Sequence, residues 1–135
     1  MADKTKFIEE LNAKYQPKGE YIVLGKGMLD GEVITEVDVN IPLKTINRHG
    51  LIAGATGTGK TKTLQVFVEQ LSHKGIPTLV MDIKGDLSGI AVEGEQNDKI
   101  NERYAKTKLP YQPQSFPVEL MTISAEKGLK LRATV

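Results

Sequence analysis

Glycine, lysine and threonine recur with a fixed spacing between residues 54 and 61, where the sequence reads GATGTGKT. This spacing fits the pattern G-x-x-x-x-G-K-[ST] at every fixed position. A loop of this kind surrounds a polyphosphate with backbone N–H groups, and the helix that follows points its positive end at the same anion. The pattern therefore predicts a strand, a glycine-rich loop and a helix in that order, with nucleotide binding at the loop.

The segments on both sides of the loop fit that order. Residues 50–53 form a short, mostly apolar run, which is typical of a buried parallel strand. Apolar residues then recur between 64 and 71 at the spacing of one helix face, and Gly75 and Pro77 mark the end of that helix. A second apolar run at 78–81 predicts the next strand of a parallel sheet, joined by a right-handed crossover.

The pattern also assigns roles to individual residues. Lys60 would reach the β- and γ-phosphates, and the Thr61 hydroxyl would bind Mg²⁺. Lys60 is thus also a candidate catalytic residue. We predict that the nucleotide contacts come from a continuous stretch of the chain: Gly54, Ala55, Thr56, Gly57, Thr58, Gly59, Lys60, Thr61 and Lys62.

Asp82 follows the apolar run 78–81 directly. An aspartate at the carboxyl edge of a parallel strand points into the crevice where ligands bind. Asp82 is therefore a second candidate catalytic residue and a candidate Mg²⁺ ligand. The alternative is a polar residue that only satisfies solvent and backbone where a strand ends.

Composition limits the possible classes of protein. The chain has 135 residues, about one domain, and its net charge of +1 gives no argument for or against nucleic acid. Because it has no cysteine, disulfides and thiolate metal sites are excluded. No apolar run has the length of a membrane span, and the N-terminus lacks the apolar core of a signal peptide. We therefore expect no membrane association and a cytoplasmic location.

The remaining segments predict further elements. An amphipathic helix begins near Phe7, and strands follow at 21–24, ended by glycines, and at 33–41. Residues 1–44 would then form an N-terminal helix and a small β element. Residues 45–135 would form the first part of a nucleotide-binding domain, with a surface helix at 96–106, a proline-rich loop at 110–117, and strands at 118–123 and 129–135.

Residues 48–61 (RHGLIAGATGTGKT) and 81–87 (MDIKGDL) closely resemble the bacterial HerA-like ATPases. These belong to the HerA/FtsK group of DNA-pumping motors, within the RecA-like class. The resemblance covers roughly residues 40 to 135. It implies an α/β fold, a partial P-loop NTPase (RecA-like) three-layer core with parallel strands, preceded by a small N-terminal β element. It also implies ATP and Mg²⁺ as cofactors and, for the full-length protein, DNA as partner and a homo-hexameric ring.

In this family the acidic pair that activates water lies on a later strand, and no apolar run ending in Asp-Glu occurs here after residue 90. The resemblance therefore makes Asp82 a secondary residue of the crevice. It also implies that this chain is an N-terminal portion that binds ATP, with hydrolysis only in the longer protein. Because the family forms rings, Arg48 could reach a neighbour's phosphates, although a solvated arginine is the alternative. Arg103 and Arg132 are weaker candidates.

Other functions remain open from the sequence. A P-loop phosphotransferase would use Asp82 to orient an acceptor or a metal, but no lid or acceptor pocket is identifiable. A nucleotide-dependent interaction module without catalysis is a second alternative. A GTPase is disfavoured because the guanine-recognition motif Asn-Lys-x-Asp is absent.

Overall fold

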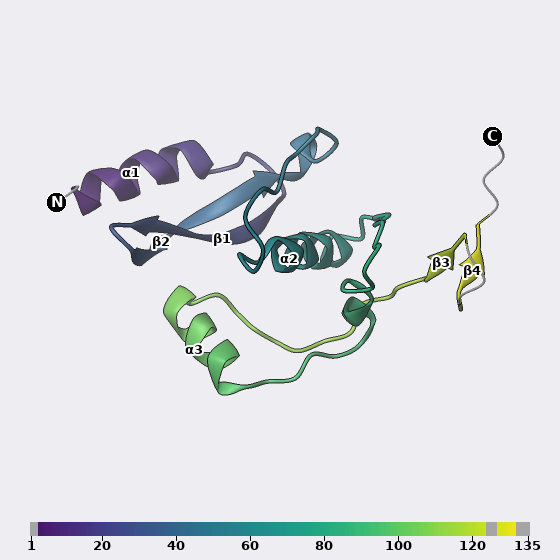
Figure 1. The fold of residues 1–135 in the computed structure, drawn as a ribbon. Helices are drawn as coiled ribbons and strands as arrows, with labels where there is room; N and C mark the ends of the chain where they lie inside the picture. Colours follow the sequence, from purple (N-terminus) through teal and green to yellow (C-terminus); the bar gives the residue numbers. More distant parts are fainter. Residues whose placement is uncertain (1–2, 124–126, 132–135) are drawn as a thin grey trace.

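The computed structural model describes residues 3–123 and 127–131 (Figure 1). Within these residues, helices and strands form a mixed α/β arrangement. The elements follow in the order α1 (Lys4–Tyr15), β1 (Tyr21–Leu29), β2 (Glu32–Pro42), η1 (Leu43–Thr45), α2 (Lys60–His73), η2 (Ser88–Ala91), α3 (Asp98–Thr107), β3 (Met121–Thr122) and β4 (Leu129–Lys130), where η denotes a 3₁₀ helix.

The strands β1 and β2 form an antiparallel hairpin. Its two-residue turn, Asp30-Gly31, has φ values of 49° and 84°, as a type I′ turn requires at both positions. The prediction that glycines end β1 after residue 24 was wrong, because the strand continues to Leu29. The pairing register shifts beside Gly27, where a Cβ would lie 3.0 Å from Val37 Cγ1, so glycine lets the two strands approach closely.

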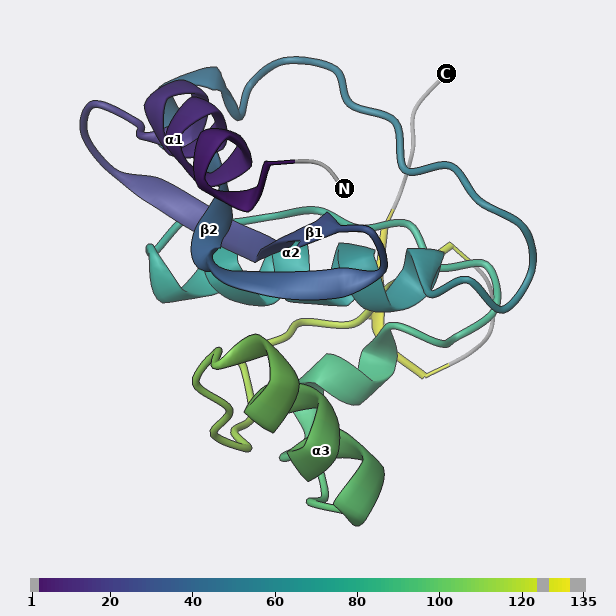
Figure 2. The same cartoon turned by 90° about the vertical axis from the view of Figure 1, so that its left-hand side faces the viewer.

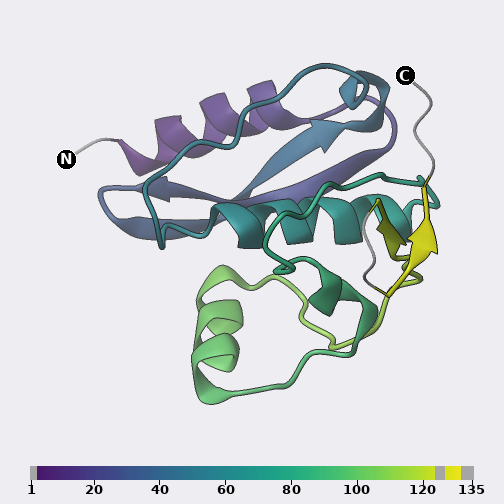
Figure 3. The same ribbon diagram turned by 45° about the vertical axis from the view of Figure 1, so that its right-hand side comes forward.

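The hairpin is the middle layer of a small sandwich, with α1 on one face and α2 on the other (Figures 1 and 3). Helix α1 contacts β2, and α2 contacts β1. Ile22, Ile34 and Val37 are each at most 2% exposed. In a regular strand, residues 34 and 37 would face opposite sides. Both can be buried because a helix covers each face of the hairpin.

Helix α2 confirms the predicted helix after the glycine loop and ends as predicted. Gly75 has a φ of 70° and its N–H donates to the Ser72 carbonyl oxygen at 2.9 Å. The N–H of Ile76 donates to the Leu71 carbonyl oxygen at 3.0 Å. These two bonds form a Schellman motif, which satisfies carbonyl groups in the last turn of the helix.

The two predicted parallel strands around α2 are not formed. Residues 50–53 and 78–81 are irregular, and Leu51, Leu79 and Met81 are 88%, 80% and 89% exposed. A parallel strand needs neighbours that satisfy its backbone and cover both its faces. Within residues 3–123 and 127–131 no segment pairs with either run, so the expected strands are not formed in this part of the chain. The mixed α/β class is confirmed, whereas the described part of the chain does not form a three-layer parallel core.

Past α2, the chain follows the predicted order in part. Helix α3 confirms the predicted surface helix, and the Asn97 side chain accepts a hydrogen bond from the Ile100 N–H at its start. No helix or strand occupies 108–120, in accord with the prolines. The predicted strands at 118–123 and 129–135 are confirmed only for the short parallel pair β3 and β4 (Figure 3). Residues 132–135, including Arg132, lie outside the described residues.

Figure 2 shows the path from the hairpin to α2. After η1, residues 46–59 form a wide irregular arc that brings the chain to the start of α2. This arc carries the glycine-rich loop. None of the helices in the described part of the chain combines the length and the apolar character needed to cross a bilayer.

Candidate functional site

The glycine-rich loop depends on its glycines for its shape. Gly57 and Gly59 have φ values of 80° and 93°, which side-chain-bearing residues rarely adopt. Gly59 is also the N-cap residue of α2. At Gly54 the constraint is space, because a Cβ there would lie 2.5 Å from Thr58 Oγ1. Both glycines that the sequence pattern fixes are therefore required by the geometry of the loop.

The carbonyl oxygen of Ala55 is the centre of the loop's hydrogen bonds. It accepts from Thr58 Oγ1 at 2.8 Å and from Lys60 Nζ at 2.7 Å. The Lys60 ammonium group is thus folded back from the first turn of α2 over the loop. A phosphate placed in this loop could take over the Lys60 donor from the Ala55 carbonyl.

The N-terminus of α2 carries an unusual charge arrangement. No side chain caps the helix at Gly59, and the first turn contains no acidic residue. Lys60 and Lys62 instead place two cations near the positive end of the helix. An unfavourable charge at a helix end costs about 0.3–1 kcal/mol. An anion bound at this end would offset that cost and would accept from the N–H groups of the first turn.

The carboxylate of Asp82 is bonded to backbone amides that follow it. Its Oδ1 accepts from the N–H groups of Gly85 and Lys84 at 2.9 and 3.2 Å, and its Oδ2 accepts from the Leu87 N–H at 2.8 Å. The Leu87 bond is the largest of the effects that lower the pKa of Asp82 below its ordinary value. The carboxylate is therefore charged at neutral pH, and in this structure it organises a loop.

The structure does not bring Asp82 directly to the glycine loop. Within residues 3–123 and 127–131, no hydrogen bond or ion pair joins Asp82 to Lys60 or Thr61. No group of three or more acidic, histidine or cysteine side chains in this part of the chain could hold a metal ion. Thr61 is exposed in the first turn of α2. The predicted shared role of Thr61 and Asp82 at a metal ion stays a prediction.

Gln65 connects these two regions and was missed by sequence reasoning. It is the buried polar residue of α2, 8% exposed, and its Nε2 donates to the Asp86 carbonyl oxygen at 3.0 Å. A signal was present in the sequence, because Gln65 precedes Val68 by three residues and so lies beside the apolar face of the helix. A polar residue in that position must find a buried partner.

The structure describes two of the three arginine candidates. Arg48 lies exposed near the start of the arc that leads to the loop, and Arg103 is exposed on α3. In the described part of the chain, neither guanidinium group forms a hydrogen bond or an ion pair. Their predicted approach to phosphates of a neighbouring subunit stays a prediction.

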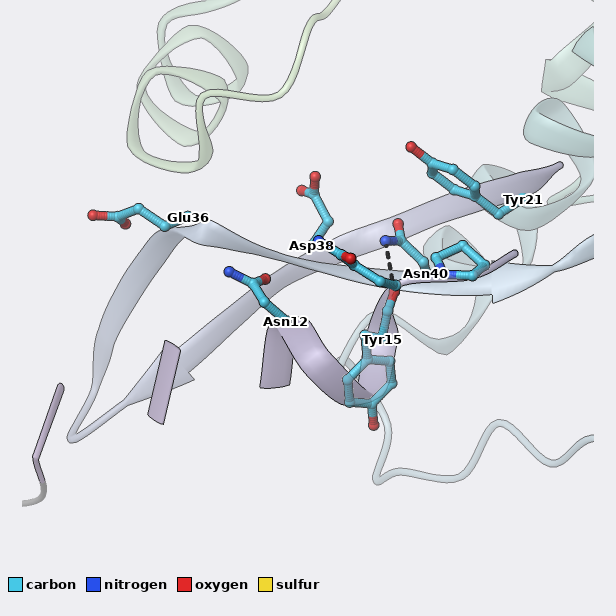
Figure 4. Close-up of a pocket in the computed structure, with 8 residues that line it drawn as sticks. Asn12, Tyr15, Tyr21, Glu36, Asp38 and Asn40 are labelled. Carbon is cyan, nitrogen blue, oxygen red and sulfur yellow. Dashed lines mark hydrogen bonds between the residues drawn. The ribbon is translucent and has the colours of Figure 1, made fainter. Parts of the chain in front are cut away.

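A cavity of about 430 Å³ lies at a different place, between the end of α1 and the strand β2 (Figure 4). Asn40 Nδ2 donates to the Tyr15 carbonyl oxygen at 3.1 Å beside this cavity. None of the predicted nucleotide-binding residues lines it. Its lining consists of Asn12, Tyr15, Gln16, Pro17, Tyr21, Glu36, Asp38 and Asn40.

Known proteins resemble this chain in sequence. Over 78 residues, 55% of the chain, it is 35% identical to a probable helicase of Methanocaldococcus jannaschii, of which the match covers 15%. Over 78 residues, 58% of the chain, it is 32% identical to the DNA double-strand break repair helicase HerA of Saccharolobus solfataricus, of which the match covers 14%. The chain thus spans about one seventh of the length of these relatives. No solved structure matches it.

A family match covers most of the chain. The family described as "Helicase HerA-like C-terminal" matches residues 28–135, a range that includes β2, the glycine loop and the Asp82 segment. The match confirms the resemblance seen in the two motifs, whereas the bacterial source stays a prediction. This chain therefore belongs to the helicase HerA-like C-terminal family.

Proposed function

We propose that residues Gly54–Thr61 bind ATP as the Walker A segment of a HerA-like ATPase. The observation that carries this proposal is the start of α2, where an uncapped helix end, two lysines and a glycine-shaped loop converge without an acidic side chain. This combination suits a polyphosphate, because the N–H groups, the helix dipole and the lysine charges all favour an anion. The HerA-like family and its helicase relatives favour ATP among the possible nucleotides.

Each residue of the loop has a distinct task in this proposal. Lys60 leaves the Ala55 carbonyl oxygen and donates to the β- and γ-phosphates. Thr61 presents its hydroxyl group to Mg²⁺, which would screen the phosphate charge when bound. Lys62 adds positive charge near the same end of the helix. Gly54 and Gly59 keep the backbone close enough for its amides to donate to the phosphates.

We assign the larger functions to the whole protein. The helicase relatives are about seven times longer than the region matched here. In the longer protein, we propose, the exposed apolar runs 50–53 and 78–81 pair as parallel strands of a RecA-like three-layer core. ATP hydrolysis, DNA as partner, assembly into a homo-hexamer and a cytoplasmic location belong to the same proposal. Its support is the family match and the exposure of Leu51, Leu79 and Met81.

Calorimetric titration of Mg·ATP into the wild-type chain and a Lys60→Ala variant tests the binding site. Hydrogen bonds to charged groups contribute about 1.5–3 kcal/mol, so we expect the variant to bind ATP about 10- to 100-fold more weakly. Lys99→Ala is the matched control, because Lys99 is an exposed lysine in the first turn of another helix, α3. Equal ATP affinity in the wild type and Lys60→Ala would remove the proposal.

A second measurement separates this function from its alternatives. A motor ATPase releases phosphate faster when DNA is added to the full-length protein. A phosphotransferase instead moves phosphate to a small acceptor without DNA, and a binding module does neither. Phosphate release measured with and without DNA, on the full-length protein, therefore distinguishes the three.

A further inference from the structure

Gln65 lies where the helix of the glycine loop meets a second loop. Its side chain is 8% exposed, and its Nε2 lies 3.0 Å from the Asp86 carbonyl oxygen that it donates to. Gln65 follows Lys60 by five residues, which is about 7.5 Å along a helix axis. The buried amide therefore ties Asp86 to a point just over one turn beyond the phosphate-binding end of α2.

Residues 82–87, here named the Asp82 loop, are held together by their own hydrogen bonds. The Asp82 carboxylate accepts from the amides of Lys84, Gly85 and Leu87. Ser88 Oγ donates to the Gly85 carbonyl oxygen at 2.9 Å and closes the end of the loop. Because these bonds make the segment one unit, a single bond from Gln65 to Asp86 can position the whole Asp82 loop against α2.

We infer that Gln65 is a positioning residue that couples the phosphate-binding end of α2 to the Asp82 loop. This inference rests on the proposed ATP binding. A phosphate that accepts from Lys60 and from the first-turn amides would replace the Lys60–Ala55 bond and fix the start of the helix. A hydrogen-bonded helix is stiff over five residues, so the restraint reaches Gln65 and, through its amide, Asp86.

Asp82 and Gln65 have separate effects on the Asp82 loop. Asp82 folds the loop internally, and Gln65 sets its place relative to α2. Loss of the Gln65 donor should leave the internal bonds in place but remove the response of the loop to nucleotide. A purely structural role for Gln65 would instead change the loop equally with and without nucleotide.

Hydrogen exchange at the amides of Lys84, Gly85 and Leu87 tests this inference. In the wild-type chain, saturating Mg·ATP should slow their exchange by about threefold or more. In Gln65→Met, which keeps the length of the side chain but has no donor, these rates should be the same with and without Mg·ATP. The affinity for ATP should remain within about threefold of wild type. Gln70→Met is the matched control on the same helix, since no hydrogen bond of the Gln70 side chain occurs within the described residues.

A second donor-free variant and a check on the integrity of α2 distinguish the possible results. Gln65→Leu also lacks the donor and should behave like Gln65→Met. The amides of Gly75 and Ile76 report whether α2 is intact in each variant. If the wild type binds ATP but its Asp82 loop does not respond, or if both donor-free variants respond as the wild type does, the inference is overturned and the proposed function stands. If the wild type binds no ATP, both are overturned.

Discussion

Gly54 faces the Thr58 side chain so closely that a Cβ at residue 54 would lie 2.5 Å from Thr58 Oγ1. Thr58 cannot simply turn away, because the same hydroxyl donates to the Ala55 carbonyl oxygen at 2.8 Å. We therefore predict that Gly54→Ala weakens Mg·ATP binding by about tenfold or more, equivalent to about 1.4 kcal/mol. Titration calorimetry measures the change.

The control and the partner variant follow from the same geometry. Gly50 has open space where a Cβ would be added, so Gly50→Ala should bind ATP as the wild type does. Thr58→Ala removes the atom that clashes, so the double variant Gly54→Ala/Thr58→Ala should bind more tightly than the product of the two single effects predicts. Strict additivity in this cycle would contradict the proposed clash.

The Leu87 amide is the chief cause of the lowered pKa of Asp82. From this we predict that the amides bonded to Asp82 lose their protection in acid. A carboxylate whose pKa is lower in the folded than in the unfolded state stabilises its loop at any pH above the unfolded-state pKa. This stabilisation is lost as the pH falls through the folded-state pKa. The unfolded value is near 3.8, so protection of the Lys84, Gly85 and Leu87 amides should persist to pH 3.8 and be lost below it. Hydrogen exchange as a function of pH measures this window.

Asp82→Asn is the matched variant for that experiment. It keeps an oxygen acceptor but removes the titrating charge, so protection of the same three amides should be weaker at neutral pH and should not depend on acid. If wild type and Asp82→Asn have the same pH profile, a different group causes the transition.

Local patterns in the sequence were the reliable guides to this fold. The apolar spacing of α2 and the Gly75 stop each depend on residues close together in the chain, and each appears in the structure. The runs 50–53 and 78–81 fit buried strands, yet they lie exposed. An apolar run shows that a segment has surface to bury, but a parallel strand also needs partners that its own sequence does not specify.

The candidate site was also predicted only in part. The loop pattern identified the residues whose backbone geometry is now visible, Gly54 and Gly59 among them. The position of Asp82 after an apolar run suggested a ligand, whereas its carboxylate accepts from three nearby amides. The Gln65–Asp86 bond joins residues 21 positions apart, and no spacing rule in the sequence predicts such a contact.

The pKa of Glu69, on α2, predicts a dependence of stability on pH that is opposite in sign to that of Asp82. Burial is the largest effect on its pKa and raises it above the ordinary 4.5, while Lys62 and His73 oppose the change. A carboxyl group whose pKa is higher in the folded than in the unfolded state favours the fold at any pH below the unfolded-state pKa. This contribution is lost as the pH rises through the folded-state pKa. We therefore expect Glu69→Gln to raise the melting temperature at pH 7 and to leave it nearly unchanged below pH 4.5. A variant that is less stable than wild type at pH 7 would show that the charged form is favoured.

The end of α2 gives a prediction that is independent of nucleotide. Gly75 has a φ of 70°, and its N–H and that of Ile76 close the helix through the carbonyl oxygens of Ser72 and Leu71. A Cβ in this left-handed conformation costs about 1 kcal/mol, so Gly75→Ala should lower the free energy of unfolding by about that amount. Gly89→Ala is the control, because Gly89 has open space around it and no positive φ. Urea denaturation followed by circular dichroism compares the two, and a stable Gly75→Ala variant would mean that the helix ends differently in solution.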